Sequence, residues 1–95
     1  MTKPVTTSDL GTLKNLGPTS VGWLCACGIT SAAELRRVGA VLAYRIVRHR
    51  FPTANALLLF ALHGALTDTH WNALDPATKA RLRAEAEGPL VIGAG

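Results

Sequence analysis

The sequence predicts an all-α fold, a small bundle of five or six short helices packed on one central apolar helix. Three observations lead to this prediction. No long stretch rich in β-branched residues alternates apolar and polar side chains, so we expect no sheet. Residues that favour helix ends punctuate the chain at short intervals. The stretch 55–66, NALLLFALHGAL, is apolar nearly all round, which is typical of a buried central helix.

Length and composition predict one folded domain. The chain has 95 residues, of which 48% are hydrophobic and 17% are charged, and this argues against disorder. We expect a flexible N-terminus over 1–7, a helical domain over 8–87 and a short tail over 88–95, in which Leu90-Val91-Ile92 could dock on the core. No signal-peptide pattern occurs, and no apolar run approaches the ~18 residues of a membrane span, so we expect a soluble, cytoplasmic protein without a membrane partner.

Two helices joined by a tight turn are expected near the N-terminus. A serine at the start of 8–14 is a good N-cap for the first of them. The second covers about 18–27 and begins at Pro18, because the missing N–H of proline would be unpaired at the first helical position anyway. Gly28 can adopt the left-handed conformation that ends a helix, and Ile29 can then fold back as a hydrophobic contact.

Two further helices follow. The third, a short one, begins at Ser31-Ala32-Ala33-Glu34, which fits a capping box with Glu34 reaching back to the Ser31 backbone. The fourth covers Ala40 to about His49 and is ended by Phe51-Pro52, because the residue before a proline avoids the helical region. We expect the basic residues of this helix on one face and Leu42, Ala43, Ile46 and Val47 on the opposite, apolar face.

The last two helices have clear start signals. Thr53 is the expected N-cap of the central helix over 55–66. Asp75-Pro76 gives an N-cap followed by a proline at the first position of a last helix over about 76–87. Between them we interpret His70-Trp71 as a loop anchor, with the indole buried and the imidazole bonded to the turn.

Residues 13–29, LKNLGPTSVGWLCACGI, contain a recognisable motif. This stretch resembles a helix-hairpin-helix element, which pairs two helices through a turn of glycine, hydrophobe, glycine. Here the turn reads Asn15-Leu16-Gly17. It is also similar to the Asn-Leu-Gly turn in the DNA-binding domain at the C-terminus of the RNA polymerase alpha chain. The expected bundle therefore contains a helix-hairpin-helix-like element packed on the central apolar helix.

A second resemblance, to the TfoX C-terminal domain family, covers about 13–83. It rests on an ordered set of residues: Leu16-Gly17-Pro18, Ser20, Trp23-Leu24, Gly28-Ile29, Leu35, Gly39-Ala40, Ala43-Tyr44, Asn55, Leu58, Ala61-Leu62, Gly64-Ala65, His70-Trp71 and Leu74. The resemblance implies an all-helical, helix-hairpin-helix-like domain and supplies no catalytic residues.

The same resemblance implies a process. TfoX (Sxy) proteins are bacterial regulators of natural transformation and work as co-activators with a cyclic-AMP receptor protein at competence promoters. They usually carry an additional N-terminal α/β domain. Only about a dozen residues precede the match in this chain, so we expect that domain to be absent here. A transcription-related protein partner follows from the resemblance.

The turn itself carries a hypothesis of nucleic-acid binding. A helix N-terminus presents unpaired N–H groups and a positive dipole end, which favour phosphate. Gly17 would let a backbone approach closely, Ser20 could add a hydroxyl and Lys14 a charge. However, Asn15 replaces the first glycine and Pro18 removes one donor. The competing, favoured interpretation is that the turn only packs the two helices together.

A cluster of arginines suggests a second route to nucleic acid. Five lie within fifteen residues, the densest charge in a chain whose net charge is +4. If the third and fourth helices fold together, they could form one basic surface that suits phosphate. The alternative is a solvated face that keeps the domain soluble. The residues are Arg36, Arg37, Arg45, Arg48 and Arg50.

Trp23 is the candidate protein-contact residue. It lies away from the side of its helix that carries Val21 and Leu24, so either another helix or a protein partner must cover it. Core packing is the favoured interpretation.

No catalytic or metal site is predicted. Cys25 and Cys27 are two residues apart in a helix, so their side chains point to different sides and cannot bond to each other. The three histidines show no metal-ligand spacing. The acidic residues lie mostly at caps and helix surfaces, without a partnered nucleophile or a carboxylate pair. We therefore expect no cofactor, no metal and no enzymatic activity.

The sequence thus predicts a non-enzymatic regulatory and interaction module that acts through protein contacts in transcription regulation. The alternative is a direct DNA-binding, helix-hairpin-helix domain that contacts phosphates through the turn over 15–20 and the arginine surface.

Overall fold

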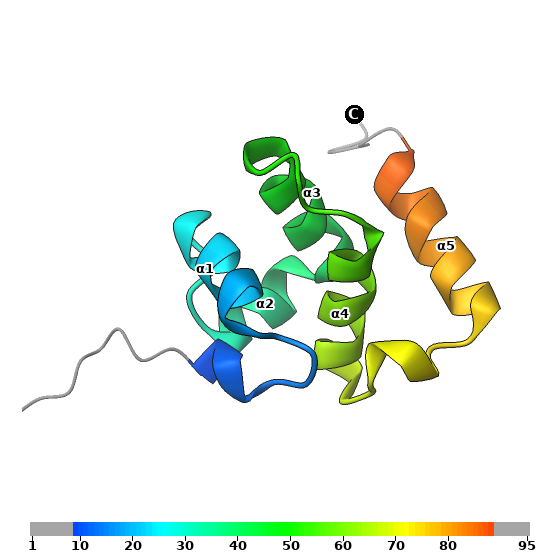
Figure 1. Cartoon of the computed structure of the whole chain (residues 1–95), viewed down its shortest axis with the longest axis horizontal. Helices are drawn as coiled ribbons and strands as arrows, with labels where there is room; N and C mark the ends of the chain where they lie inside the picture. Colours follow the sequence, from blue (N-terminus) through cyan, green and yellow to red (C-terminus); the bar gives the residue numbers. More distant parts are fainter. Residues whose placement is uncertain (1–8, 89–95) are drawn as a thin grey trace, which may run out of the picture.

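The computed structural model describes residues 9–88 and confirms the all-α prediction. The expected flexible N-terminus, the serine cap of the first helix and Leu90-Val91-Ile92 lie outside the described residues. Within 9–88 there is no strand. Five α-helices and two 3-10 segments follow one another in this order: η1 Asp9–Thr12, α1 Pro18–Ala26, α2 Ala32–Val38, α3 Ala40–Arg50, α4 Ala56–Thr67, η2 Trp71–Ala73 and α5 Pro76–Glu87 (Figure 1).

The apolar helix α4 is the most buried helix of the bundle, as its sequence predicted, but α3 and not α4 packs against all the other α-helices. Helix α4 packs against α3, α5 and η2, and α3 also contacts α5 directly (Figure 1). The α4 residues Leu59 and Leu62 are at most 1% exposed. Burying a leucine stabilises a fold by about 1.5–3 kcal/mol. The other elements contribute the remaining fully buried large side chains: Leu10, Leu24, Leu35 and Val47.

The prediction of a first α-helix is wrong, because the chain forms a short 3-10 segment there. Within 9–14 the chain forms only the four-residue 3-10 segment η1, which contains the poor helix former Gly11. Its Asp9 carboxylate accepts the backbone N–H of Ala32 at 2.7 Å and so serves the start of α2. The chain then turns at Asn15, whose φ is +72°. The hairpin therefore joins a 3-10 segment to α1.

The predicted end of α1 is confirmed. Gly28 has a φ of +88°, and its N–H donates to the Cys25 carbonyl at 3.0 Å. The Ile29 N–H donates to the Leu24 carbonyl at 2.9 Å, and the Ile29 side chain is only 4% exposed. This pair of bonds with its hydrophobic contact is the Schellman motif, which satisfies carbonyls left unpaired at the helix end.

The capping box at α2 differs from the prediction in one bond. The Ser31 hydroxyl accepts the Glu34 N–H at 3.1 Å, as expected. The Glu34 carboxylate reaches one residue further back than predicted and accepts both the N–H and the hydroxyl of Thr30, at 2.7 and 2.9 Å. These hydrogen bonds lower the pKa of Glu34, and the nearby Arg37 charge acts in the same direction.

This cap makes stability depend on pH. Because the folded-state pKa of Glu34 is lowered, its ionised form stabilises the fold above the unfolded pKa of about 4.3, and this contribution is lost as pH falls through the folded pKa. We expect the melting temperature to fall less between pH 6 and pH 3 in Glu34→Gln than in the wild type. Glu87→Gln, at the end of α5, is the control and should keep the wild-type slope; equal slopes in all three proteins would contradict the prediction.

Helix α3 buries only part of the apolar side predicted for it: Ala43 and Val47 face the core as expected, whereas Leu42 and Ile46 do not. It ends at Arg50, one residue beyond the prediction, and buries Ala43, Tyr44 and Val47. Leu42 and Ile46 are 38% and 36% exposed. The buried face of α3 is set by tertiary contacts, because α3 packs against α1, α2, α4 and α5 at once.

The predicted cap of α4 is also wrong by two residues. Asn55, and not Thr53, is the N-cap, because the Asn55 side-chain oxygen accepts the Leu57 N–H at 3.0 Å. The start of α5 is confirmed, with the Asp75 carboxylate accepting the Thr78 N–H at 3.3 Å ahead of a proline at the first position.

Candidate functional site

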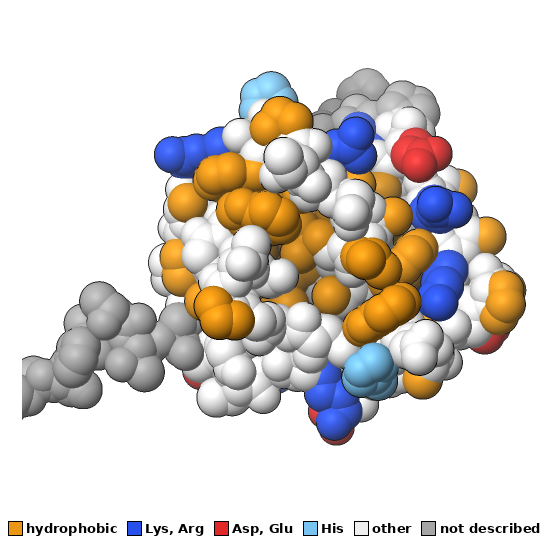
Figure 2. Space-filling view, in the orientation of Figure 1, with side chains coloured by type: hydrophobic (Ala, Val, Ile, Leu, Met, Phe, Trp, Pro, Cys, Tyr) orange, Lys and Arg blue, Asp and Glu red, His pale blue; other side chains and the backbone are white. Residues whose placement is uncertain are grey.

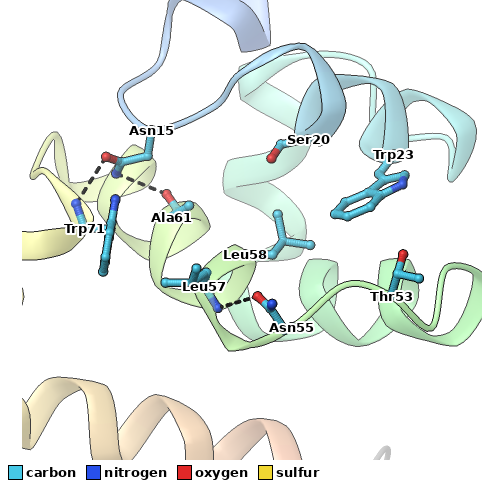
Figure 3. A pocket seen from close by; sticks show the side chains of 9 residues that line it. All are labelled: Asn15, Ser20, Trp23, Thr53, Asn55, Leu57, Leu58, Ala61 and Trp71. Atoms are coloured by element: carbon cyan, nitrogen blue, oxygen red, sulfur yellow. Dashed lines mark hydrogen bonds between the residues drawn. The ribbon is translucent and has the colours of Figure 1, made fainter.

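Hydrogen bonds of the Asn15 side chain link the turn before α1 to the backbone of α4 and of the segment from α4 into η2. The Asn15 side-chain nitrogen donates to the Thr69 carbonyl at 3.0 Å and to the Ala61 carbonyl at 3.4 Å, and its oxygen accepts the Trp71 N–H at 3.1 Å (Figure 3). Asparagine tolerates the left-handed conformation that the turn requires. We call these three hydrogen bonds the Asn15 bridge; they hold α4 and η2 against the hairpin.

A pocket of about 260 Å³ lies beside this bridge. Trp23 from α1 and Trp71 from η2 stand on opposite sides of it, with Leu57 and Leu58 of α4 between them (Figure 3). We call it the tryptophan pocket. The remaining lining residues are Asn15, Ser20, Thr53, Asn55 and Ala61.

The two indoles are held by neighbouring side chains. Trp23 stacks on Phe51, with ring centroids 5.9 Å apart, and is only partly buried. Trp71 is half-buried rather than buried, and the Lys79 ammonium of α5 lies 5.5 Å from its ring centroid. The predicted His70 anchor bonds within η2 itself, where Nδ1 accepts the Asn72 N–H at 3.1 Å. Both indoles are therefore fixed in position and still accessible from the pocket.

The rim combines an exposed leucine with polar groups. Leu57 is 50% exposed, the most exposed large hydrophobic residue within 9–88. Ser20 and Thr53 contribute hydroxyls that form no hydrogen bond within the described part of the chain. Figure 2 shows hydrophobic side chains gathered around a hollow between α1 and α4, with lysine and arginine side chains at the periphery of this face. The pocket can thus take an apolar side chain and bond to a neighbouring polar group.

The other predicted turn residues take no part in the Asn15 bridge. Lys14 is exposed and lies 3.7 Å from the Asp68 carboxylate, another exposed group. Gly17 is the exposed N-cap of α1, without a side-chain hydrogen bond at that position. Ser20 lines the tryptophan pocket one turn into the helix. The Asn15 side chain turns inward to its bridge.

Three of the five predicted arginines bond within the fold. Arg45 donates to three carbonyls at the end of α5, and Arg50 donates to the Ala26 carbonyl at the end of α1 at 2.7 Å. Both satisfy carbonyls that a helix end leaves unpaired. Arg48 donates to the Tyr44 hydroxyl at 2.9 Å. The remaining two, Arg36 and Arg37, are exposed in the last turn of α2.

No cluster of three or more metal-ligating side chains occurs within residues 9–88. Cys25 and Cys27 are free, partly buried thiols. In the same part of the chain, no helix has the length and apolar character to span a membrane.

Sequence reasoning singled out Asn15, Ser20 and Trp23 but missed that they share a pocket with Leu57 and Trp71. An asparagine at the glycine position of the turn was the available signal, since it offers a side-chain amide where the motif has none. The exposure of Leu57 had no signal, because it lies in an apolar stretch that is typical of a uniformly buried helix.

Comparisons with known proteins fit this geometry. A family model, that of the TfoX C-terminal domain, matches residues 6–86. A crystal structure of an uncharacterized protein from Listeria monocytogenes, in a triclinic form, is 31% identical, with a TM-score of 0.74 over 78% of this chain and 84% of that chain. A tetragonal form of a protein of unknown function from Listeria monocytogenes is 29% identical, with a TM-score of 0.75 over 79% and 93%. No curated protein matches. With a match over most of its length, the chain belongs to the TfoX C-terminal domain family.

Proposed function

We propose that this domain is a non-enzymatic protein-interaction module in transcription regulation, and that the tryptophan pocket is where its partner docks. The observation that carries the proposal is the exposed Leu57 on the rim of a pocket flanked by Trp23 and Trp71. The family suggests the process, regulation of natural transformation, and the partner, a transcription regulator of the cyclic-AMP receptor class.

The chemistry of the pocket favours protein over nucleic acid. Partly exposed tryptophans that are held in place are typical centres of protein interfaces. Full burial of a leucine contributes about 1.5–3 kcal/mol, so covering the half-exposed Leu57 would add about 1 kcal/mol to binding. Phosphate, by contrast, needs unpaired donors and positive charge, and the face around the pocket has a hydrophobic centre (Figure 2).

The test uses the two tryptophans, the only ones in the chain, as reporters. Adding the cyclic-AMP receptor protein should shift the indole N–H signals of Trp23 and Trp71 in a ¹⁵N NMR titration. Leu57→Asp should weaken that binding at least tenfold, because a charged group would enter the apolar contact. Leu42→Asp is the matched control: it places the same charge on an exposed leucine of α3 and should leave the affinity unchanged. Equal loss in both variants, or no indole shift, would overturn the proposal.

Direct DNA binding is the second candidate, favoured by the exposed start of α1 at Gly17 with Lys14 beside it. Titration with duplex DNA at increasing salt concentration separates the two candidate functions. The affinity of a protein that binds phosphates falls steeply with salt, and each phosphate contact adds about 0.9 to the slope of log affinity against log salt concentration. Lys14→Ala would flatten that slope if DNA is the ligand, and Leu57→Asp would leave it unchanged.

A further inference from the structure

The lining of the tryptophan pocket is uncharged. None of its described lining residues carries a charge, and the Lys79 ammonium that lies near the Trp71 ring is outside the lining. Burying a charged group costs free energy unless a partner of opposite charge meets it. The pocket therefore fits an uncharged segment of a partner better than an acidic or a basic one.

The polar side-chain groups that remain free in the pocket can all donate a hydrogen bond. The Asn55 side-chain oxygen caps α4, but the amide nitrogen beside it forms no hydrogen bond within the part of the chain that the structure describes. Ser20 from α1 and Thr53 from the segment before α4 each add a free hydroxyl (Figure 3). The Ala61 carbonyl and the Asn15 side-chain oxygen already accept bonds of the Asn15 bridge. The pocket thus suits a ligand that brings unpaired carbonyl groups.

The two indoles narrow the choice of ligand further. Trp23 and Trp71 offer partly buried aromatic surfaces on opposite sides of the pocket (Figure 3). A segment in the polyproline II conformation has no internal hydrogen bonds, so its carbonyls are unpaired, and proline has no N–H that needs an acceptor. Such segments dock in aromatic-lined grooves. A helical segment uses its interior carbonyls within the helix and leaves the donors of the pocket unpaired.

We propose that the tryptophan pocket takes an extended, uncharged segment of its partner that contains proline and leucine. The inference rests on the proposed function, because it names the kind of segment that docks there. The proline rings pack on the two indoles, and a leucine of the segment covers Leu57. Its carbonyls accept hydrogen bonds from Ser20, Thr53 and Asn55.

A titration with short peptides tests the inference. The peptide acetyl-PPLPPLPP-amide should shift the indole N–H signals of Trp23 and Trp71 in ¹⁵N NMR spectra. Acetyl-AALAALAA-amide keeps the leucines but loses the preformed conformation, so it should bind about tenfold more weakly. Acetyl-PPEPPEPP-amide should also bind about tenfold more weakly, because its carboxylates would lie unpaired in the pocket. Equal affinity for either control peptide would overturn the inference.

Two pairs of variants test the donors. Asn55→Asp keeps an oxygen that caps α4 equally well but removes the amide donor, so it should weaken binding of the proline peptide about tenfold at an unchanged melting temperature. Asn72→Asp makes the same change at an exposed asparagine outside the lining and should leave the affinity unchanged. Thr53→Val should weaken binding about two- to tenfold, whereas Thr19→Val, at an exposed threonine of α1 outside the lining, should not. Equal losses within either pair would overturn the inference.

The same titrations separate this inference from the proposed function. If the cyclic-AMP receptor protein shifts the indole signals and the proline peptide does not, the inference is wrong and the proposed function stands. If neither shifts them, both are wrong. Shifts with the peptide alone support the inference and overturn only the choice of partner.

Discussion

Replacing Gly64 with alanine will lower the free energy of unfolding by about 3 kcal/mol, even though alanine is the better helix former. Gly64 lies in α4, where a β-carbon would press against the Thr69 carbonyl oxygen and the Asn15 side-chain nitrogen. Overpacking a rigid site costs about 1–3 kcal/mol. Here the added methyl also separates partners of the Asn15 bridge, and each disrupted hydrogen bond adds about 1 kcal/mol.

Gly22→Ala is the matched control, since nothing lies within 4 Å of a β-carbon added at Gly22 in α1. Alanine is better than glycine by about 1 kcal/mol in a helix interior, so this variant should be as stable as the wild type or more so. Urea denaturation followed by circular dichroism measures both. If the two variants respond alike, the close approach at Gly64 does not constrain the fold.

Replacing Asn15 with alanine will cost about 3–4 kcal/mol. The change removes all three bonds of the Asn15 bridge and leaves the Trp71 N–H and the Thr69 carbonyl without their partner. It also places an alanine at a φ of +72°, which costs an ordinary residue about 1–2 kcal/mol.

Asn15→Gly separates these two contributions, because glycine accepts the left-handed backbone but lacks the amide. We expect it to recover about 1 kcal/mol relative to Asn15→Ala and to remain well below the wild type in urea denaturation. Full recovery in the glycine variant would mean that only the backbone conformation of the turn matters. No difference between the two variants would mean that the conformation contributes nothing.

Local signals explain how much could be predicted from the sequence. Pro18, Gly28 and Asp75 act on backbone within four residues, so the start of α1, its end and the start of α5 were predictable. The burial of α4 was predictable because a helix that is apolar nearly all round is buried in the core. The resemblance to the TfoX C-terminal domain family, stated over about 13–83, is confirmed by a family model that matches residues 6–86.

Contacts between distant elements explain the failures. The side of α3 that faces inward depends on four neighbouring helices, so the exposure of Leu42 and Ile46 has no counterpart in local spacing. Arg45 and Arg50 looked like part of a charged surface, but the carbonyls they bond to lie at least 24 residues away along the chain. The tryptophan pocket was missed for the same reason.

The Asn15 bridge has a consequence for the order in which the domain assembles. Two of its bonds join residues 54 and 56 positions apart, so they close a loop that contains α1 to α4. Loop closure of that length is entropically costly and is offset only once the intervening helices are packed. Bonds that form after the folding transition state affect the unfolding rate and leave the folding rate almost unchanged. We therefore expect Asn15→Ala to raise the unfolding rate and to leave the folding rate almost unchanged.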